Sequence, residues 1–258
     1  MKKLQLIIIT TFLLSCSTTP TGRSQLKLMP EGQMAKMGDT SFSELKKKRK
    51  TSSDKKQNEA VKCITDRLLV AMGEKPKEWK IEVFIDESPN AFALPGKNMG
   101  VHTGMIKLVK NNDQLAAVIG HEIGHVLADH GNERVSQNML TQGVVAAGAV
   151  ALGSNPKRDL ILVGAMGLAQ YGVLMPFSRS HESEADALGV KYMAKAGFDP
   201  KEAAELWKLM SKGAGKTPPE FLSTHPSPKS RIEALTKLAP KYEEDFKTSS
   251  NRNSCPKI

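Results

Sequence analysis

The residues best suited to chemistry form one short motif. His121, Glu122 and His125 make the pattern HEXXH, within a stretch that we expect to be helical from about residue 112 to His130. Residues four apart in an α-helix advance about 400° at 3.6 residues per turn, so the two imidazoles project from one face, one turn apart. Such a pair suits a single Zn²⁺ ion, and the neighbouring Glu122 can take a proton from zinc-bound water.

A catalytic zinc site usually has three protein ligands and an open position for water. Candidates for the third ligand lie on a second expected helix, which contains His181, Glu182, Glu184 and Asp186. Glu182 and Asp186 are four residues apart and share one face, so one carboxylate can bind zinc while the other fixes the tautomer of a ligand imidazole. Spacing alone leaves the choice among His181, Glu182 and Glu184 open.

Two further histidines are interpreted differently. His130 follows His125 by five residues, about 140° round a continuous helix, and we expect it to point away as a surface or outer-sphere histidine. His102 lies in an expected strand and has no ligand partner at a suitable spacing, so we interpret it as structural.

The elements around the motif must position these side chains. Apolar residues recur with a helical or an alternating period in short segments separated by Gly and Pro. These patterns predict strands over residues 79–85, 90–95 and 99–105, and helices over 58–72, 112–130, 199–212 and 231–238. The expected fold is therefore α+β and mainly α, with a small antiparallel sheet beside the HEXXH helix.

Residues 139–177 are rich in Ala, Gly, Val and Leu. Their last part, Leu160 to Phe177, has 18 residues without a charge, which reaches the lower limit for a transmembrane helix. Gln170, Tyr171 and interruptions by glycine favour a buried helical hairpin or an active-site flap. Membrane insertion is the alternative.

The overall composition limits the class of protein. The chain has 258 residues, 40% of them hydrophobic and 5% aromatic, and a net charge of +10. These values exclude collagen-like, low-complexity and disulfide-scaffold chains and an ordinary polytopic membrane protein. Eight basic residues against three acidic ones lie between Glu44 and Lys62. This run suits a membrane surface or a solvated face, and no aromatic platform accompanies it, which argues against nucleic-acid binding.

The start of the chain is typical of an exported protein. Two lysines precede an apolar run from Leu4 to Leu14, which is too short to span a bilayer. The residues Leu13 to Cys16 resemble the lipobox of bacterial lipoproteins, which implies cleavage before Cys16 and acylation of that residue. Ser17 favours, by the same resemblance, the outer membrane. An ordinary signal peptide with a chance cysteine is the alternative.

Several motifs together resemble one family. HEIGH at 121–125 is followed 57 residues later by Glu182 in the pattern ExxxD, and is preceded by NAFALPG at 90–96 and TGM at 103–105. This combination is similar to the zinc peptidase family of the CAAX prenyl proteases and HtpX, and within it to the soluble, periplasmic lipoprotein branch that acts in outer-membrane quality control. The resemblance covers about residues 20–240. It implies a zincin-like helical metallopeptidase domain with one zinc ion per chain.

The resemblance also implies roles for individual residues. By that match His121, His125 and Glu182 bind zinc and Glu122 is the general base. Asp186 is described in the family either as the carboxylate that supports a ligand histidine or as a proton donor. We favour the first role, because an Asp beside a ligand histidine should stay ionised.

The segment Asn90, Ala91, Phe92 and Ala93 has a functional interpretation of its own. In HEXXH peptidases a strand beside the zinc helix offers its unpaired edge to an extended substrate. A purely structural hairpin is the alternative. The family commonly has a small residue where this chain has Lys97, which leaves the geometry of the edge open.

The segment Thr224-His225-Pro226, with Arg231 six residues after the histidine, also resembles a family element near the site. We hypothesise that His225 lies near the zinc and can plug its open coordination position, while Arg231 orients the loop. A structural loop histidine is the alternative.

The remaining cysteines and the domain division complete the expectation. Cys63 and Cys255 are an even pair that can form a disulfide in an oxidising periplasm, and two free thiols are the alternative. We divide the chain into a lipoprotein signal peptide (1–15), a lipidated tether (16–40), a zinc metallopeptidase domain (41–240) and a polar tail (241–258).

Together these features predict a zinc metalloendopeptidase anchored by lipid to the bacterial cell envelope, at the outer membrane and facing the periplasm. Its expected substrates are misfolded or misassembled envelope proteins, whose peptide bonds it hydrolyses. Its other expected partners are the membrane and the outer-membrane assembly machinery. A non-proteolytic chaperone or assembly lipoprotein with a plugged or structural zinc site is the alternative, although a structural site needs no general base. The second alternative is an integral-membrane protease in which residues 160–177 span the membrane.

Overall fold

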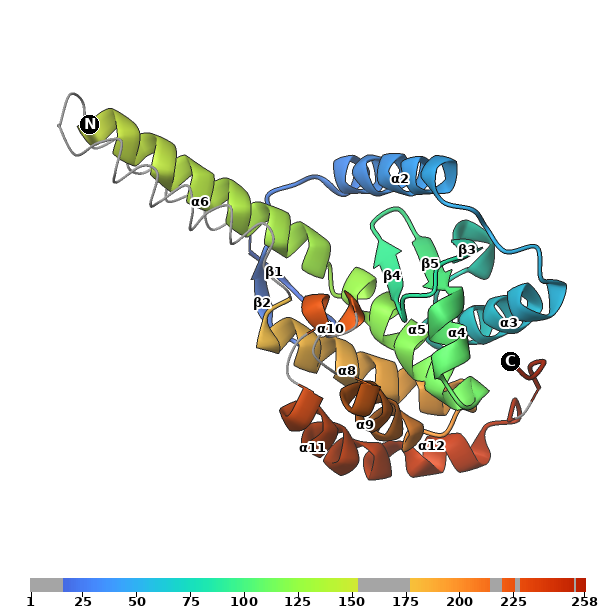
Figure 1. Cartoon of the computed structure of the whole chain (residues 1–258). Coiled ribbons are helices and arrows are strands. Elements are labelled where there is room, and N and C mark those ends of the chain that lie inside the picture. The colour runs from blue at the N-terminus through green and yellow to red at the C-terminus, as the bar shows by residue number, and fades with distance from the viewer. Residues whose placement is uncertain (1–15, 153–176, 214–219, 226–227, 253) are drawn as a thin grey trace.

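The computed structural model describes residues 16–152, 177–213, 220–225, 228–252 and 254–258 (Figure 1). The strands are β1 (Cys16–Thr18), β2 (Ser24–Leu26), β3 (Lys80–Phe84), β4 (Ala91–Leu94) and β5 (Asn98–His102). The α-helices are α2 (Glu31–Lys48), α3 (Lys55–Ala71), α4 (Thr103–Leu108), α5 (Asn112–Leu127), α6 (His130–Leu152), α8 (Arg179–Lys195), α9 (Glu202–Gly213), α10 (Glu220–Thr224), α11 (Pro228–Leu238) and α12 (Glu243–Thr248). The expected class, α+β and mainly helical, is confirmed.

The central sheet has three strands in the order β3-β5-β4. β4 and β5 pair antiparallel as a hairpin, whereas β3 pairs parallel to β5. The expectation of a wholly antiparallel sheet was therefore wrong, because the chain after β3 passes to the far side of the sheet before it returns through the hairpin. β5 also ends before the expected strand does: Thr103 begins α4, and its Oγ1 donates a hydrogen bond to the carbonyl of Asp86 at 3.0 Å.

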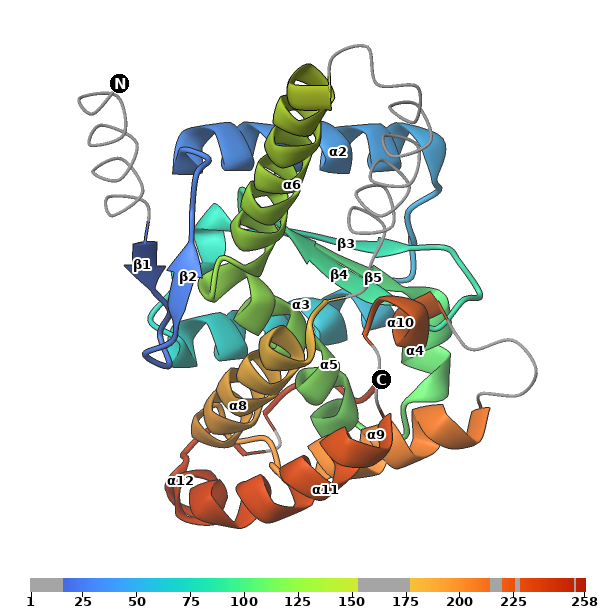
Figure 2. The ribbon, with the colours of Figure 1, turned by 90° about the vertical axis from the view of Figure 1, so that its left-hand side faces the viewer.

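Helix α5, which carries the HEXXH motif, is the centre of the molecule. Asn111 caps its start, since the side chain accepts a hydrogen bond from the backbone N–H of Gln114 at 2.8 Å. Leu115, Ile119 and Ile123 are fully buried. Figure 2 shows α5 between the sheet with α3 on one side and α8 with α9 on the other. A helix enclosed in this way holds its side chains in fixed positions.

Two glycines let α8 approach α5 closely. A Cβ atom on Gly124 would lie 3.1 Å from the carbonyl oxygen of Ala185, and one on Gly189 would lie 3.1 Å from the backbone nitrogen of His121. Larger residues at these positions would push the helices apart. The short distance between the backbones brings the first turn of α8 beside the HEXXH face.

The start of the described chain packs on the body of the protein. β1 and β2 form an antiparallel hairpin, and Arg23 between them pairs with Glu133 of α6 and Glu184 of α8. Helix α2 crosses the end of the β4–β5 hairpin so closely that a Cβ on Gly38 would overlap the carbonyl of Pro95. The segment interpreted as a tether thus contributes a strand pair and part of α2.

The end of the chain is also tied to the body. Cys63 of α3 and Cys255 form the expected disulfide, with their Cα atoms 5.7 Å apart. Asn112, the first residue of α5, donates from its side chain to the carbonyl of Pro256 at 3.0 Å. The polar tail therefore includes α12 and a covalent attachment near the start of the HEXXH helix. The division of the chain into functional segments stays a prediction.

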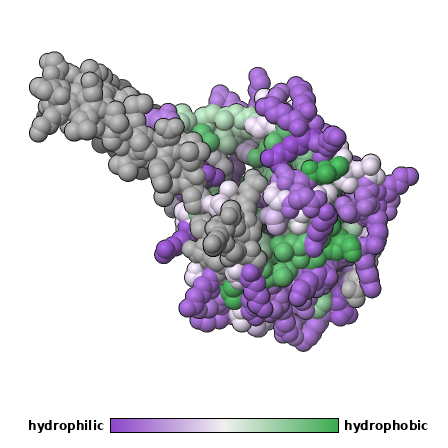
Figure 3. Space-filling model, viewed as in Figure 1, coloured by the Kyte–Doolittle hydropathy of each residue, from purple (hydrophilic) through white to green (hydrophobic). Residues whose placement is uncertain are grey.

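Helix α6 extends beyond the rest of the molecule in Figure 1. It contains the beginning of the apolar stretch at residues 139–177. Residues 153–176, which hold most of the predicted hairpin or flap, lie outside the described residues. None of the helices that the structure describes has both the length and the apolar character needed to cross a membrane. Hydrophilic side chains predominate on the face shown in Figure 3.

Candidate metal centre

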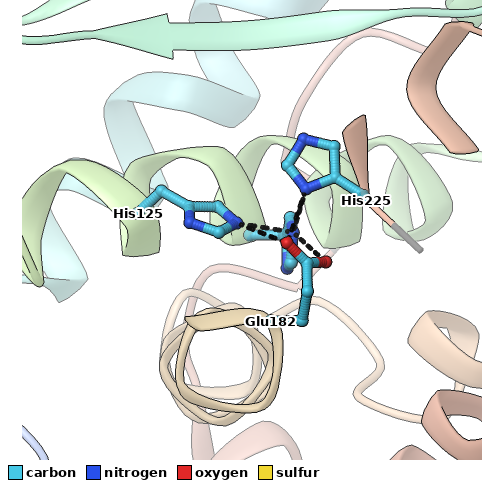
Figure 4. Close-up of side chains that lie close together, drawn as sticks. His125, Glu182 and His225 are labelled. Atoms are coloured by element: carbon cyan, nitrogen blue, oxygen red, sulfur yellow. Dashed lines mark hydrogen bonds and ion pairs between the residues drawn. The ribbon is translucent and has the colours of Figure 1, made fainter. Parts of the chain in front are cut away.

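Four buried side chains direct donor atoms at one another. His121 and His125 come from one face of α5, Glu182 from the first turn of α8, and His225 from the residue after α10. His121 Nε2 lies 3.0 Å from His125 Nε2 and 3.3 Å from His225 Nδ1, which is 2.9 Å from Glu182 Oε1. Figure 4 shows the two labelled imidazoles pointing at the carboxylate that rises from α8.

The donor set fits a zinc ion. Tetrahedral zinc with bonds of about 2.0–2.2 Å holds its ligand atoms about 3.3–3.6 Å apart. One ligand atom from each of the four residues can be chosen so that all lie within 4.8 Å of one another, and each residue is at most 4% exposed. Imidazole nitrogen with carboxylate oxygen is a donor combination that zinc prefers. A cation among them would compensate the buried carboxylate.

The electrostatics of the cluster also favour a cation. Burial would raise the pKa of Glu182, but hydrogen bonds from His121, His125 and His225 outweigh it and hold that pKa far below its usual value. Burial and the charge of Arg231 would lower the pKa of His121, yet hydrogen bonds to Asp186 and Glu182 raise it to about 9. The carboxylates therefore stabilise positive charge at this position, whether it is carried by a proton or by a metal ion.

Asp186 and Arg231 lie directly behind His121. Asp186 Oδ1 is 3.0 Å from His121 Nδ1, and Asp186 Oδ2 accepts a hydrogen bond from Arg231 Nε at 2.7 Å. Arg231 also donates to Glu182, and its guanidinium carbon lies 3.6 Å from the centre of the Trp207 ring. Burial would raise the pKa of Asp186, but Arg231 outweighs it and keeps the carboxylate ionised.

Glu122 lies between the donor cluster and strand β4. Its Oε1 atom is 3.4 Å from His225 Nε2 and has no hydrogen-bond partner among the residues that the structure describes. Burial raises its pKa, and His225, His121 and the backbone N–H of Ala93 offset part of that rise. A carboxylate with a raised pKa can accept a proton at neutral pH and release it again.

Comparison with known families agrees with this geometry. The family model described as peptidase family M48 matches residues 55–239. The chain belongs to peptidase family M48. The HEXXH motif of this family member, with the later glutamate, is intact and assembled into a zinc site, as the resemblance of the motifs implied.

Curated relatives of this M48 chain include two mitochondrial proteins and a bacterial one. Mitochondrial metalloendopeptidase OMA1 of Schizosaccharomyces pombe is 34% identical over 191 residues, which cover 73% of this chain and 55% of the relative. Human OMA1 is 30% identical over 85% of this chain and 45% of the relative. The beta-barrel assembly-enhancing protease of Escherichia coli O157:H7 is 29% identical over 84% and 46%. The chain spans about half the length of these relatives.

Strand β4 lies at the edge of the sheet beside the zinc site of this M48 chain. The carbonyl of Asn90 accepts a hydrogen bond from His102 of β5 at 2.9 Å. Because hydrogen bonding alternates along a strand, Ala91 and Ala93 direct main-chain groups to the other edge, along which the described chain has no pairing strand. Gly96 and Lys97 close the hairpin with φ values of +82° and +62°, so Lys97 adopts the left-handed conformation that favours glycine.

A cavity of about 260 Å³ lies at the same place, between α2, the β4–β5 turn and the junction of α5 with α6. Ala93 and His125 are among the residues that line it. Most of the remaining lining is apolar and includes Met34, Ala35, Pro95, Val126 and Phe177. The cavity therefore adjoins both the strand edge and the metal centre.

The structure separates the candidates that spacing left open. Glu182 faces the two histidines of α5, whereas Glu184 contacts His130 and His181 contacts Glu133. His181 Nε2 lies 3.1 Å from Glu133, and His102 lies away from the cluster, beside Ser88 of the loop before β4.

The expectation that His130 points away from the site was wrong, whereas its interpretation as an outer-sphere histidine agrees with the structure. Its Nδ1 atom lies 2.8 Å from His125 Nδ1, and the residue is fully buried. The wheel argument failed because α5 ends at Leu127, and Asp129, with φ of +53°, turns the chain so that His130 begins a new helix. Sequence reasoning also missed Arg23, whose only signal is a charged residue in an uncharged Ser/Thr/Pro/Gly-rich segment.

Proposed function

We propose that this M48 chain is a zinc metalloendopeptidase of the bacterial cell envelope that hydrolyses misfolded or misassembled envelope proteins. The observation that carries the proposal is the donor cluster of His121, His125 and Glu182 with the buried Glu122 between it and a strand edge. A purely structural zinc site has no need of Glu122.

The reaction we propose is hydrolysis of a peptide bond by water. Zinc, when bound, polarises the scissile carbonyl and makes the water more acidic. Glu122 takes a proton from the attacking water and transfers it to the leaving amine, which its raised pKa permits. Asp186 accepts a hydrogen bond from His121 and keeps that imidazole in the tautomer and orientation of a ligand.

The strand edge supplies substrate binding in this proposal. An extended segment would pair with the outer edge of β4 through main-chain hydrogen bonds at Ala91 and Ala93, which demand little of its sequence. The adjoining apolar cavity would accept one of its side chains. Extended, apolar segments are exposed by unfolded proteins, which supports misfolded chains as the substrate class.

Envelope anchoring rests on the sequence and on one relative. Residues 1–15 have the character of a signal peptide and Cys16 that of a lipidation site. The relative from E. coli is named for beta-barrel assembly, which supports outer-membrane proteins and their assembly machinery as partners. With two lipid chains on Cys16 the protein would be held firmly on the outer membrane, facing the periplasm. A Cys16→Ala variant with a cleavable signal peptide should move from the membrane to the soluble fraction on carbonate washing; retention in the membrane would contradict the anchor.

Peptidase activity is tested with the zinc-loaded mature protein and unfolded casein. Cleavage that stops with 1,10-phenanthroline and returns with added zinc is the expected result.

The position of His225 at the fourth corner of the donor set favours a second candidate, a chaperone or assembly lipoprotein with a plugged site. If neither the wild type nor a His225→Ala variant cleaved casein with zinc bound, the peptidase proposal would be overturned in favour of this one.

A further inference from the structure

A second polar cluster lies behind His125, on the side away from the other ligands. Arg23, from the N-terminal hairpin, donates to Glu184 Oε2 from Nε at 2.9 Å. The same carboxylate oxygen is 3.1 Å from His130 Nε2, and His130 Nδ1 is 2.8 Å from His125 Nδ1. We call the series Arg23, Glu184 and His130 the outer relay. It connects residues 23 and 125 through three consecutive contacts.

The donors and acceptors of the outer relay have one consistent direction. His125 directs Nε2 at His121 and Glu182, so as a neutral metal ligand it carries its proton on Nδ1. That N–H donates to His130 Nδ1, which must then be the acceptor nitrogen. His130 consequently carries its own proton on Nε2 and donates it to Glu184. A carboxylate next to a ligand histidine commonly fixes its tautomer, and here a second imidazole is interposed.

Burial and charge support this arrangement. His130 is fully buried with both ring nitrogens in contact with hydrogen-bonding partners, which favours the neutral imidazole. Glu184 accepts hydrogen bonds from Arg23 and Thr21 as well as from His130, which favours its ionised form. A buried carboxylate needs a cation, and Arg23 provides it.

Arg23 is held in place by a second carboxylate. Its two terminal nitrogens donate to Glu133 at 2.9 and 2.7 Å, the paired geometry that fixes a guanidinium in one orientation. Glu133 in turn lies 3.1 Å from His181, the residue before the ligand Glu182. Through Arg23 the hairpin is therefore linked to groups beside both ligand-bearing helices. Glu184 leads to His130 and so to His125 of α5, and Glu133 leads to His181, next to Glu182 of α8.

We propose that the hairpin Cys16–Leu26 is a supporting part of the metal site, in which Arg23 and His130 act as positioning residues for His125. The hairpin fixes the imidazole that binds the ion, and by reciprocity the bound ion stabilises the docked hairpin. This inference rests on the proposed zinc site and adds a contribution from a segment that the HEXXH motif does not include.

The test compares zinc affinity by competition with a chromophoric chelator, using the mature protein. Arg23→Met and His130→Leu break the outer relay and should weaken zinc binding about 10- to 100-fold, the usual effect of removing such a support. His130→Asn keeps an acceptor near the position of Nδ1 and should bind zinc almost as the wild type does. Lys27→Met is the matched control. Lys27 directly follows the hairpin and also forms an ion pair with the body of the protein, at Asp129, but it is not part of the outer relay.

Hydrogen exchange supplies a readout that does not depend on activity. Zinc loading should slow amide exchange over residues 16–26 in the wild type, and this protection should be lost in His130→Leu but kept in Lys27→Met. Equal zinc affinity in the wild type, Arg23→Met and His130→Leu would overturn the inference, as would an equal loss in Lys27→Met. If Arg23→Met does not fold, the comparison of His130→Leu with His130→Asn decides alone. Failure of the wild type to bind zinc would instead overturn the proposed function.

Discussion

At the scale of single residues, the metal centre is organised by charge. Glu182 lies among three imidazoles, and Asp186 lies between His121 and Arg231. These two buried carboxylates therefore each have a cation or an N–H donor beside them, as burial requires. Of the two acidic residues of the ExxxD pattern, Glu182 belongs to the donor set and Asp186 contacts His121 from behind, which fits the supporting role proposed for it.

The role of Asp186 gives the first prediction. Asp186→Asn should weaken zinc binding about 10- to 100-fold, because His121 loses the carboxylate that fixes its tautomer. Chelator competition measures the affinity, and turnover at saturating zinc should change much less. Unaltered affinity with a large fall in turnover would instead indicate the proton-donor role.

The second prediction concerns His225. Its Nδ1 atom lies 3.3 Å from His121 Nε2 and 2.9 Å from Glu182, where a fourth ligand would replace the attacking water. His225→Ala should therefore lower zinc affinity and raise the turnover of zinc-saturated protein several-fold, since water gains access to the metal. His225→Ala protein with wild-type affinity and wild-type turnover would exclude the plug.

At the scale of elements, the site depends on how α5, α8 and β4 approach one another. Gly124 and Gly189 allow α5 and α8 to lie close enough for Glu182 to reach the HEXXH face. Strand β4 runs along the other side of α5 and brings the backbone of Ala93 near Glu122. The proposed binding edge, the proposed base and the residues of the metal centre are thus carried by three packed elements.

The edge of β4 gives the third prediction. Ala93→Pro removes an outward N–H that lies near Glu122 in the free protein and would pair with substrate in the complex. The sheet should persist, because proline is tolerated where a strand donates no ladder bond. One lost main-chain hydrogen bond should lower kcat/KM about three- to tenfold with zinc content unchanged. Ala93→Val keeps the N–H and is the control; a loss as large in Ala93→Val would show that the side chain, and not the backbone donor, matters.

At the scale of the whole molecule, both ends of the described chain return to the catalytic helix. The N-terminal hairpin reaches His125 through the outer relay, and the C-terminal segment is joined to α3 and contacts Asn112. Segments far apart in sequence therefore contact α5 near both of its ends.

The disulfide gives the fourth prediction. Cys63 and Cys255 are 192 residues apart, so their bond removes much of the conformational freedom of the unfolded chain. The double variant Cys63→Ala, Cys255→Ala should lose about 2–5 kcal/mol of unfolding free energy, measured by urea denaturation with zinc present. Reduced wild type should match it. A variant as stable as the oxidised wild type would show that the bond adds nothing.

The parts of the fold that follow from local spacing could be predicted from the sequence. Two such predictions depend only on residues four apart: that HEXXH lies on a helix, and that Glu182 and Asp186 share one face of another helix. Both were confirmed. His130 was misjudged because the left-handed turn at Asp129 has no such local pattern. Arg23 and the parallel pairing of β3 with β5 depend on contacts between distant segments, which periodicity does not encode.

The most direct measurement of the central claim compares wild type and Glu122→Gln for zinc content and casein cleavage in the same samples. Glu122 is not a member of the donor set, so both proteins should bind one zinc per chain. The cleavage rate of Glu122→Gln should fall about 10²- to 10⁴-fold, the usual contribution of general acid–base catalysis. Cleavage by zinc-loaded Glu122→Gln at the wild-type rate would contradict the account.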